Sequence, residues 1–150
     1  MSAASVQPRH ALDVLLVEDD EGDVVIAQEA LRAGRLNTRL SVVRDGVAAM
    51  AYLRKEDEYS GAERPDIILL DLNLPRKSGH EVLAEMKADE SLRRIPVVVL
   101  STSASVADVV KSYDLHANVY VPKPVDFDEF TSVITQIDEF FASTVQLSPE

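Results

Sequence analysis

The sequence predicts an α/β fold of the flavodoxin-like type: a doubly wound five-stranded parallel sheet with strand order 2-1-3-4-5 and five helices. Short apolar runs alternate along the chain with stretches of helical periodicity, which calls for a parallel sheet with helices on both faces. The runs at 67–70 and 97–100 contain no polar residue, as is typical of strands buried on both faces. For five strands, the order 2-1-3-4-5 is economical and puts the switch point between strands one and three.

The first half of the chain supplies two strand–helix units. An apolar run at 11–17 ends in four acidic residues, and the helix after it, 24–33, is expected to stop at Gly34. A strand at 38–43 leads into a helix at 47–55. Helical spacing directs Val24, Ala27 and Leu31 inward from the first helix, and Val47, Met50 and either Leu53 or Tyr52 inward from the second.

A charged segment at 56–64 contains Ser60-Gly61 and is read as a surface loop longer than a minimal connection. The strand at 67–70 follows and ends at Asp71. Ser78 and Glu81 then form a capping-box pattern for the third helix, 78–88, whose inward residues are expected to be Val82, Leu83 and Met86.

The last two units are shorter and end in different residue types. A strand at 95–101 ends in hydroxyl residues and is followed by a helix at 104–115. The final strand, 118–121, runs into prolines at 122 and 124, and proline in a sheet belongs to an edge strand. The last helix, 126–141, has an apolar stripe at spacings of three and four that predicts a buried face; its members are Phe127, Phe130, Ile134, Ile137 and Phe141.

The composition limits the classes of partner and compartment. With 150 residues the chain fits one domain, which we place at 11–141 between a flexible arm, 1–10, and a polar tail, 142–150. The 26 acidic residues outnumber the 15 basic ones, so contacts with nucleic acid or anionic lipid are disfavoured. There is no cysteine and no apolar run long enough to span a membrane. We therefore expect a cytoplasmic protein.

The predicted topology brings polar residues together at the carboxyl edge of the sheet, where open α/β folds bind ligands. Clustered carboxylates repel one another unless a cation is present, and Mg²⁺ prefers oxygen ligands of this kind. No glycine-rich nucleotide loop occurs in the sequence. The residues expected in this crevice are Glu18, Asp19, Asp20, Asp71, Ser101 and Lys123.

This set of residues suits transfer of a phosphoryl group to an aspartate. The carboxylate of Asp71 would attack the phosphorus, while Mg²⁺ and the Lys123 ammonium neutralise the phosphoryl oxygens. The Ser101 hydroxyl would donate a hydrogen bond to one of those oxygens. The phosphoryl group would have to come from a donor other than bound ATP.

Four segments resemble the motifs of the receiver domain of two-component response regulators, in type, order and spacing over 11–141. They are Val17-Glu18-Asp19-Asp20, Leu70-Asp71-Leu-Asn73-Leu-Pro75 with Gly79 eight residues after the aspartate, Val98-Val99-Leu100-Ser101, and Tyr120-Val121-Pro122-Lys123-Pro124. The resemblance implies a phosphoacceptor that assists its own phosphorylation and dephosphorylation and is not otherwise an enzyme. Its phosphoryl group would come from a sensor histidine kinase.

The resemblance also implies a role for each residue. Asp71 is the phosphoacceptor, and Mg²⁺ is bound by Asp19, by Asp71 and by the backbone carbonyl of Asn73, with Glu18 acting through water. Ser101 and Lys123 contact the phosphoryl group, Tyr120 is the aromatic switch, and the Lys123–Pro124 bond is cis. Thr102 departs from the commonest pattern, in which a smaller alanine follows the serine or threonine.

More narrowly, the loop at 56–64, the run after Asp71 and the segment 112–118 resemble the small stand-alone regulators paired with phytochrome-type histidine kinases, so a bacteriophytochrome is the candidate kinase. Val133 and Phe140 add apolar surface beside the stripe of the last helix. We therefore expect a homodimer through the face of the fourth helix, last strand and last helix, or a monomer if the tail covers that surface. The alternative function is a degenerate receiver that acts as an unphosphorylated interaction module.

Overall fold

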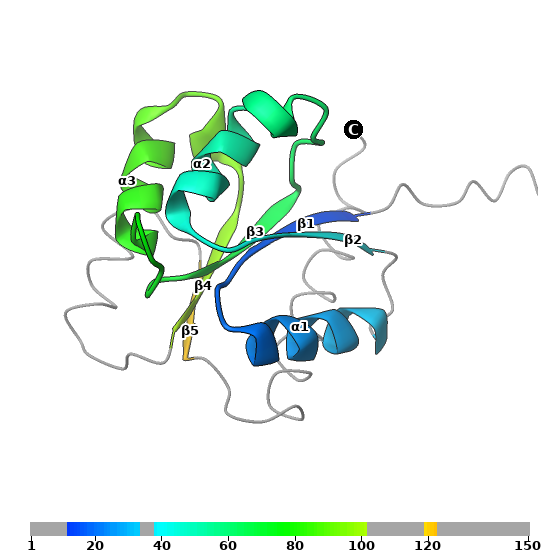
Figure 1. Ribbon diagram of the computed structural model, residues 1–150. Coiled ribbons are helices and arrows are strands. Elements are labelled where there is room, and N and C mark those ends of the chain that lie inside the picture. Colours follow the sequence, from blue (N-terminus) through cyan, green and yellow to red (C-terminus); the bar gives the residue numbers. More distant parts are fainter. Residues whose placement is uncertain (1–11, 34–37, 102–118, 123–150) are drawn as a thin grey trace, which may run out of the picture.

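The computed structural model describes residues 12–33, 38–101 and 119–122. Its five strands form one parallel sheet in the order β2-β1-β3-β4-β5, which confirms the predicted order (Figure 1). Within the described part of the chain β5 pairs with β4 alone and lies at the edge, as the prolines predict. The strands are β1 Leu12–Val17, β2 Thr38–Val43, β3 Ile67–Asp71, β4 Val97–Ser101 and β5 Val119–Pro122.

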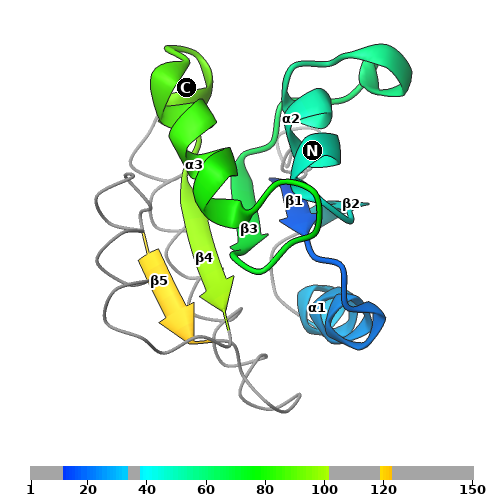
Figure 2. The same cartoon turned by 60° about the vertical axis from the view of Figure 1, so that its left-hand side comes forward.

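Among the described residues, three α-helices cover the two faces of the sheet. α1 lies on one face, and α2 and α3 lie side by side on the other, as both views of the ribbon show (Figures 1 and 2). The helices are α1 Glu21–Ala33, α2 Gly46–Leu53 and α3 Gly79–Ala88, with short 3₁₀ helices η2 Asp57–Tyr59 and η3 Leu92–Arg94. The helices predicted at 104–115 and 126–141 fall outside the described residues.

The strands alternate their side chains between two buried clusters. On the side of α2 and α3 the sheet contributes Leu15, Val17, Ile68 and Leu70. On the side of α1 it contributes Val14, Leu16, Ile67 and Leu69. Each such side chain stabilises the fold by about 1.5–3 kcal/mol when it is fully buried. β1 and β3 thus lie in the middle of the domain, and their burial fixes the positions of the residues at their carboxyl ends, Glu18 and Asp71.

Two expected helix features need correction. α1 begins at Glu21, three residues before the predicted start, because Asp20 caps it: Asp20 Oδ1 accepts a hydrogen bond of 3.0 Å from the Asp23 amide. α2 begins at Gly46, and Val47 is 39% exposed and does not face the core. The buried residues of α2 are Gly46, Ala49, Met50 and Leu53.

The inward positions predicted for α1 and α3 are confirmed, those of the last helix fall outside the described residues, and the segment at 56–64 is more structured than a plain loop. Val24, Ala27 and Leu31 of α1 and Val82, Leu83 and Met86 of α3 are buried. The segment contains η2, and the residues on either side of Glu56 have positive φ, 56° at Lys55 and 52° at Asp57. None of the described helices has the length and apolar character needed to cross a membrane.

Candidate functional site

Two carboxylates meet where the central strands end. β1 pairs with β3 in the register Val17↔Leu70, so the next residues along each strand, Glu18 and Asp71, come side by side. Carboxylate oxygens of these two residues and of Asp19 all lie within 4.8 Å of one another. Glu18 is 2% exposed and Asp71 5%, whereas Asp19 is exposed. The sequence-derived expectation that these three carboxylates converge is confirmed.

Backbone amides orient the two buried carboxylates. The Asp20 amide donates to Glu18 Oε2 at 3.1 Å, and the Asn73 amide donates to Asp71 Oδ1 at 3.1 Å. Buried carboxylates so close together repel one another, and only a compensating positive charge makes such a cluster favourable. The donor set consists of oxygen atoms and combines two buried groups with one that reaches solvent, which fits a hard divalent cation that keeps part of its water shell.

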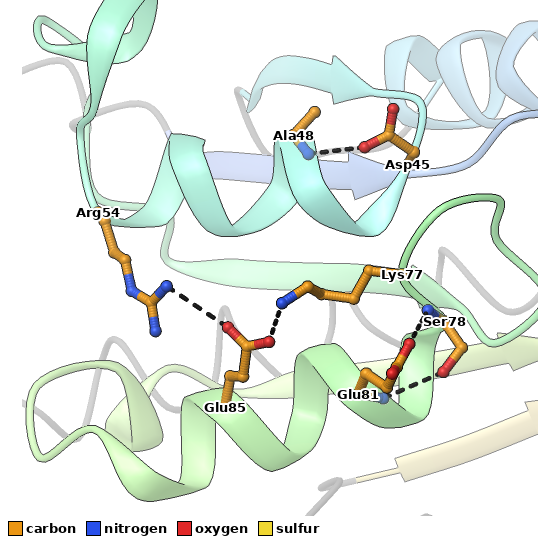
Figure 3. A network of polar contacts seen from close by, with 7 residues as sticks. All are labelled: Asp45, Ala48, Arg54, Lys77, Ser78, Glu81 and Glu85. Atoms are coloured by element: carbon orange, nitrogen blue, oxygen red, sulfur yellow. Dashed lines mark hydrogen bonds and ion pairs between the residues drawn. The ribbon is translucent and has the colours of Figure 1, made fainter.

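The connection from β3 to α3 turns back tightly against the end of β3. The Gly79 amide donates to the Leu72 carbonyl at 3.0 Å. A Cβ at Gly79 would lie 2.5 Å from the Asp71 carbonyl oxygen and 2.7 Å from Leu72 Cα, so only glycine permits this approach. Ser78 and Glu81 form the predicted capping box that starts α3 (Figure 3). The path of the chain after Asp71 is therefore set by steric contact as well as by hydrogen bonds.

The same connection is held against α2. A Cβ at Gly46 would lie 2.7 Å from the carbonyl carbon of Lys77, so the connection and the first turn of α2 touch through their backbones. Arg76 has a φ of 70°, and its guanidinium lies 3.6 Å from Asp45, the N-cap of α2. These contacts fix the outer part of the connection.

Polar side chains complete this attachment. Lys77 pairs with Glu85 of α3, and the second oxygen of Glu85 lies 3.4 Å from Arg54 Nη1 at the end of α2 (Figure 3). Glu85 thus connects both helices with the segment that leaves the site. Sequence reasoning missed Gly46, Arg76, Lys77 and Glu85, because their contacts join segments that no local pattern relates.

The other predicted site residues are placed only in part. Ser101 ends β4, the neighbour of β3, and Tyr120 lies in β5 opposite Val99. Lys123, the Lys123–Pro124 bond and Thr102 fall outside the described residues. Asp20, expected in the crevice, caps α1 instead.

Comparison with known proteins decides the family. The family model described as the response regulator receiver domain matches residues 14–135. The chain belongs to this family. Receivers of known structure share its fold: the phosphorylated cyanobacterial phytochrome response regulator RcpA is 50% identical, with 91% of this chain and 97% of RcpA covered at a TM-score of 0.85.

A further relative, Rcp1, matches this receiver both in sequence and in structure. Response regulator Rcp1 of Synechocystis sp. (strain ATCC 27184 / PCC 6803 / Kazusa) is 46% identical over 134 residues, 89% of this chain and 91% of Rcp1. The Mn²⁺-bound form of Rcp1 superposes with a TM-score of 0.83 at 46% identity, covering 89% of this chain and 96% of that one. This receiver is therefore related to phytochrome response regulators over almost its whole length.

Proposed function

We propose that this receiver is a single-domain response regulator that accepts a phosphoryl group onto Asp71 from a sensor histidine kinase. The observation that carries the proposal is the position of Asp71: a buried carboxylate at the carboxyl end of the central strand, within 4.8 Å of two further carboxylates. The kinship with RcpA, which was crystallised in its phosphorylated form, supports it. In this role the chain is a phosphoacceptor that assists its own phosphorylation and dephosphorylation, not an enzyme acting on other substrates.

Mg²⁺ is the cofactor we propose for the carboxylate cluster. Asp19, Asp71 and the backbone carbonyl of Asn73 would bind the ion directly, with Glu18 acting through water. When bound, Mg²⁺ neutralises charge on the phosphoryl oxygens. The all-oxygen donor set and the Mn²⁺-bound structure of the related Rcp1 support this choice.

The residues of the chain itself would divide the remaining work. The Asn73 amide, bonded to Asp71 Oδ1, holds the carboxylate in one orientation, so that an oxygen of Asp71 forms the new bond to phosphorus as the P–N bond to the kinase histidine breaks. The Ser101 hydroxyl and the Lys123 ammonium would contact the phosphoryl oxygens. Their movement toward the added charge would let the ring of Tyr120 change position.

The proposed partner is a phytochrome-type kinase, a bacteriophytochrome, because the relatives include the regulators RcpA and RtBRR, both described as phytochrome or bacteriophytochrome response regulators. We propose that 11–141 acts as one domain between an arm, 1–10, and a tail, 142–150, in the cytoplasm and away from nucleic acid. The net charge of −11 supports the last point.

Mass spectrometry after incubation with acetyl phosphate and Mg²⁺ tests the proposed acceptor. The wild type should gain one phosphoryl group, Asp71→Asn should gain none, and Asp20→Asn, which changes a neighbouring carboxylate used as a helix cap, should still be labelled. Labelling of Asp71→Asn at the wild-type rate would overturn the assignment. A wild-type protein that stays unlabelled would favour the degenerate interaction module.

We also propose that phosphorylation is read out through a homodimer formed by the fourth helix, last strand and last helix. Its support is the surplus of apolar residues, Val133 and Phe140, in the predicted last helix. Sedimentation with and without a phosphoryl mimic tests it, and Phe140→Glu should shift the distribution toward monomer. A protein that is monomeric in both states would leave binding to another protein as the output.

A further inference from the structure

The far end of the sheet carries a hollow that the phosphoryl chemistry does not use. It has a volume of about 370 Å³ and lies among the first residues of β1 and β2, the end of α2 and the segment between α2 and β3. Asp13, which lines the hollow, precedes Glu18 by about five residues of β1, so the hollow lies roughly 16 Å along the strand from the carboxylate site. Six of its lining residues carry the argument: Asp13, Arg39, Tyr52, Glu58, Tyr59 and Glu63.

Two tyrosine rings form one wall. The ring centroids of Tyr52 and Tyr59 are 5.4 Å apart with the planes tilted by 56°, a favourable geometry for an aromatic pair. The Tyr52 hydroxyl donates to Ser41 Oγ of β2 at 3.1 Å. Both rings are half-buried against the core, so each retains some ring surface toward the hollow.

Carboxylates make the hollow electronegative. Among the residues that the structure describes, Asp13, Glu58 and Glu63 face it together with one cation, Arg39. Arg39 is already occupied, because its Nε and Nη2 donate to both oxygens of Asp13 at 2.8 and 3.1 Å. Glu58 and Glu63 therefore set the net charge of the rim, and both are exposed. An anionic ligand would be repelled here, whereas a cation would be attracted.

The segment that closes the hollow is held in a costly conformation. Lys55 and Asp57 both have positive φ although neither is glycine, a backbone conformation that is unfavourable for most L residues. Three backbone hydrogen bonds hold the segment in this conformation. The amide of Glu56 donates to the carbonyl of Ala51 at 2.9 Å, that of Tyr59 to Glu56 at 2.8 Å, and that of Ala62 to Tyr59 at 3.0 Å. The position of Tyr59 against Tyr52 is thus specified by the backbone.

We propose that this hollow binds the guanidinium group of an arginine presented by a partner protein. A guanidinium is planar, stacks on aromatic rings and pairs with carboxylates through two parallel hydrogen bonds. The hollow offers both kinds of group side by side, and its volume is at the lower end of the roughly 300–1,000 Å³ typical of ligand sites, which suits one side chain. The proposal does not depend on phosphorylation of Asp71.

The test uses the peptide acetyl-Gly-Arg-Gly-amide and the same peptide with citrulline, a neutral isostere of arginine. NMR titration of the unphosphorylated full-length chain without Mg²⁺ should show saturable shifts of the Tyr52 and Tyr59 rings with the arginine peptide only. Affinity in the millimolar range is expected for one side chain. The absence of saturable shifts, or equal shifts with citrulline, would overturn the proposal.

Variants separate a specific site from general attraction to an acidic protein. Glu58→Gln combined with Glu63→Gln should weaken binding roughly tenfold, whereas Glu29→Gln, an exposed carboxylate on α1 that pairs with Arg32, should leave it unchanged. Tyr59→Phe should keep the affinity within about twofold and Tyr59→Leu should lower it two- to fivefold. An equal loss in Glu29→Gln would show charge attraction alone and overturn the site, whatever the phosphorylation assay gives.

Discussion

Replacing Gly46 by alanine tests how tightly the connection after Asp71 is fitted to α2. Gly46 is the first residue of α2, and a Cβ there would lie 2.7 Å from the carbonyl carbon of Lys77 and would also overlap the Lys77 carbonyl oxygen. These are backbone atoms, so no side-chain rotation relieves the contact. The Lys77 amide is also bonded to the Pro75 carbonyl at 2.7 Å, which restrains the connection further.

The expected cost follows from two opposing effects. Forcing an extra methyl group into a packed contact costs about 1–3 kcal/mol, whereas alanine is favoured over glycine inside a helix by up to about 1 kcal/mol. We expect a net loss of about 1–2 kcal/mol in the free energy of unfolding. In urea this lowers the midpoint of unfolding by roughly 0.5–1 M, given the usual dependence on denaturant.

The same change should slow phosphorylation, because the displaced connection carries Asn73, whose amide orients Asp71. Urea unfolding and the rate of labelling by acetyl phosphate measure the two effects. Gly61→Ala is the matched control, since nothing lies within 4 Å of a Cβ at that position. If Gly46→Ala unfolds at the wild-type urea concentration, or Gly61→Ala loses as much stability, the inferred contact is wrong.

Three further predictions concern charged and titrating groups. Asp19→Ala should raise the Mg²⁺ concentration needed for half-maximal labelling by roughly tenfold or more, and labelling at the wild-type Mg²⁺ dependence would exclude Asp19 as a ligand. Glu85→Gln should lower the free energy of unfolding by no more than about 1 kcal/mol, a difference that added salt should reduce in urea titrations. Burial, and then the charge of Glu58, raise the pKa of Tyr59 above 10.0. Because the folded pKa is the higher one, stability should fall as the pH rises from 10 through the folded pKa, and Tyr59→Phe should flatten that fall in unfolding measurements.

The sheet and the carboxylate cluster were predictable because both follow from local patterns. Unbroken apolar runs identify the central strands, and the order of strands then places Glu18 beside Asp71 without any knowledge of side-chain contacts. The errors came where one local signal competed with another. Asp20 could be a site residue or a helix cap, and the structure shows the cap. Val47 fits a helical spacing counted from the wrong first residue, since α2 starts one position earlier.

The contacts that could not be predicted are those between segments distant in sequence. Gly46 meets Lys77 and Glu85 meets Arg54 across 31 residues in each case, and neither pair has a sequence pattern of its own. The hollow lined by Tyr52 and Tyr59 depends on the packing of these two rings. The backbone between them takes positive φ at Lys55 and Asp57. The charged composition of the segment at 56–64 predicts a surface loop, but it does not predict the conformation of that loop.

α2, like β1, reaches both the site and the hollow. Its first residue, Gly46, contacts the connection that leaves Asp71, and Tyr52 near its end lines the hollow. Eight residues of α-helix span only about 12 Å, so any shift of this helix on phosphorylation must reach the hollow as well. If phosphorylation of Asp71 changes the affinity for arginine by some factor, linkage requires that arginine binding change the equilibrium constant for phosphorylation by the same factor. If the affinity stays the same, phosphorylation does not alter the hollow, and the change made at Asp71 must be read elsewhere on the receiver.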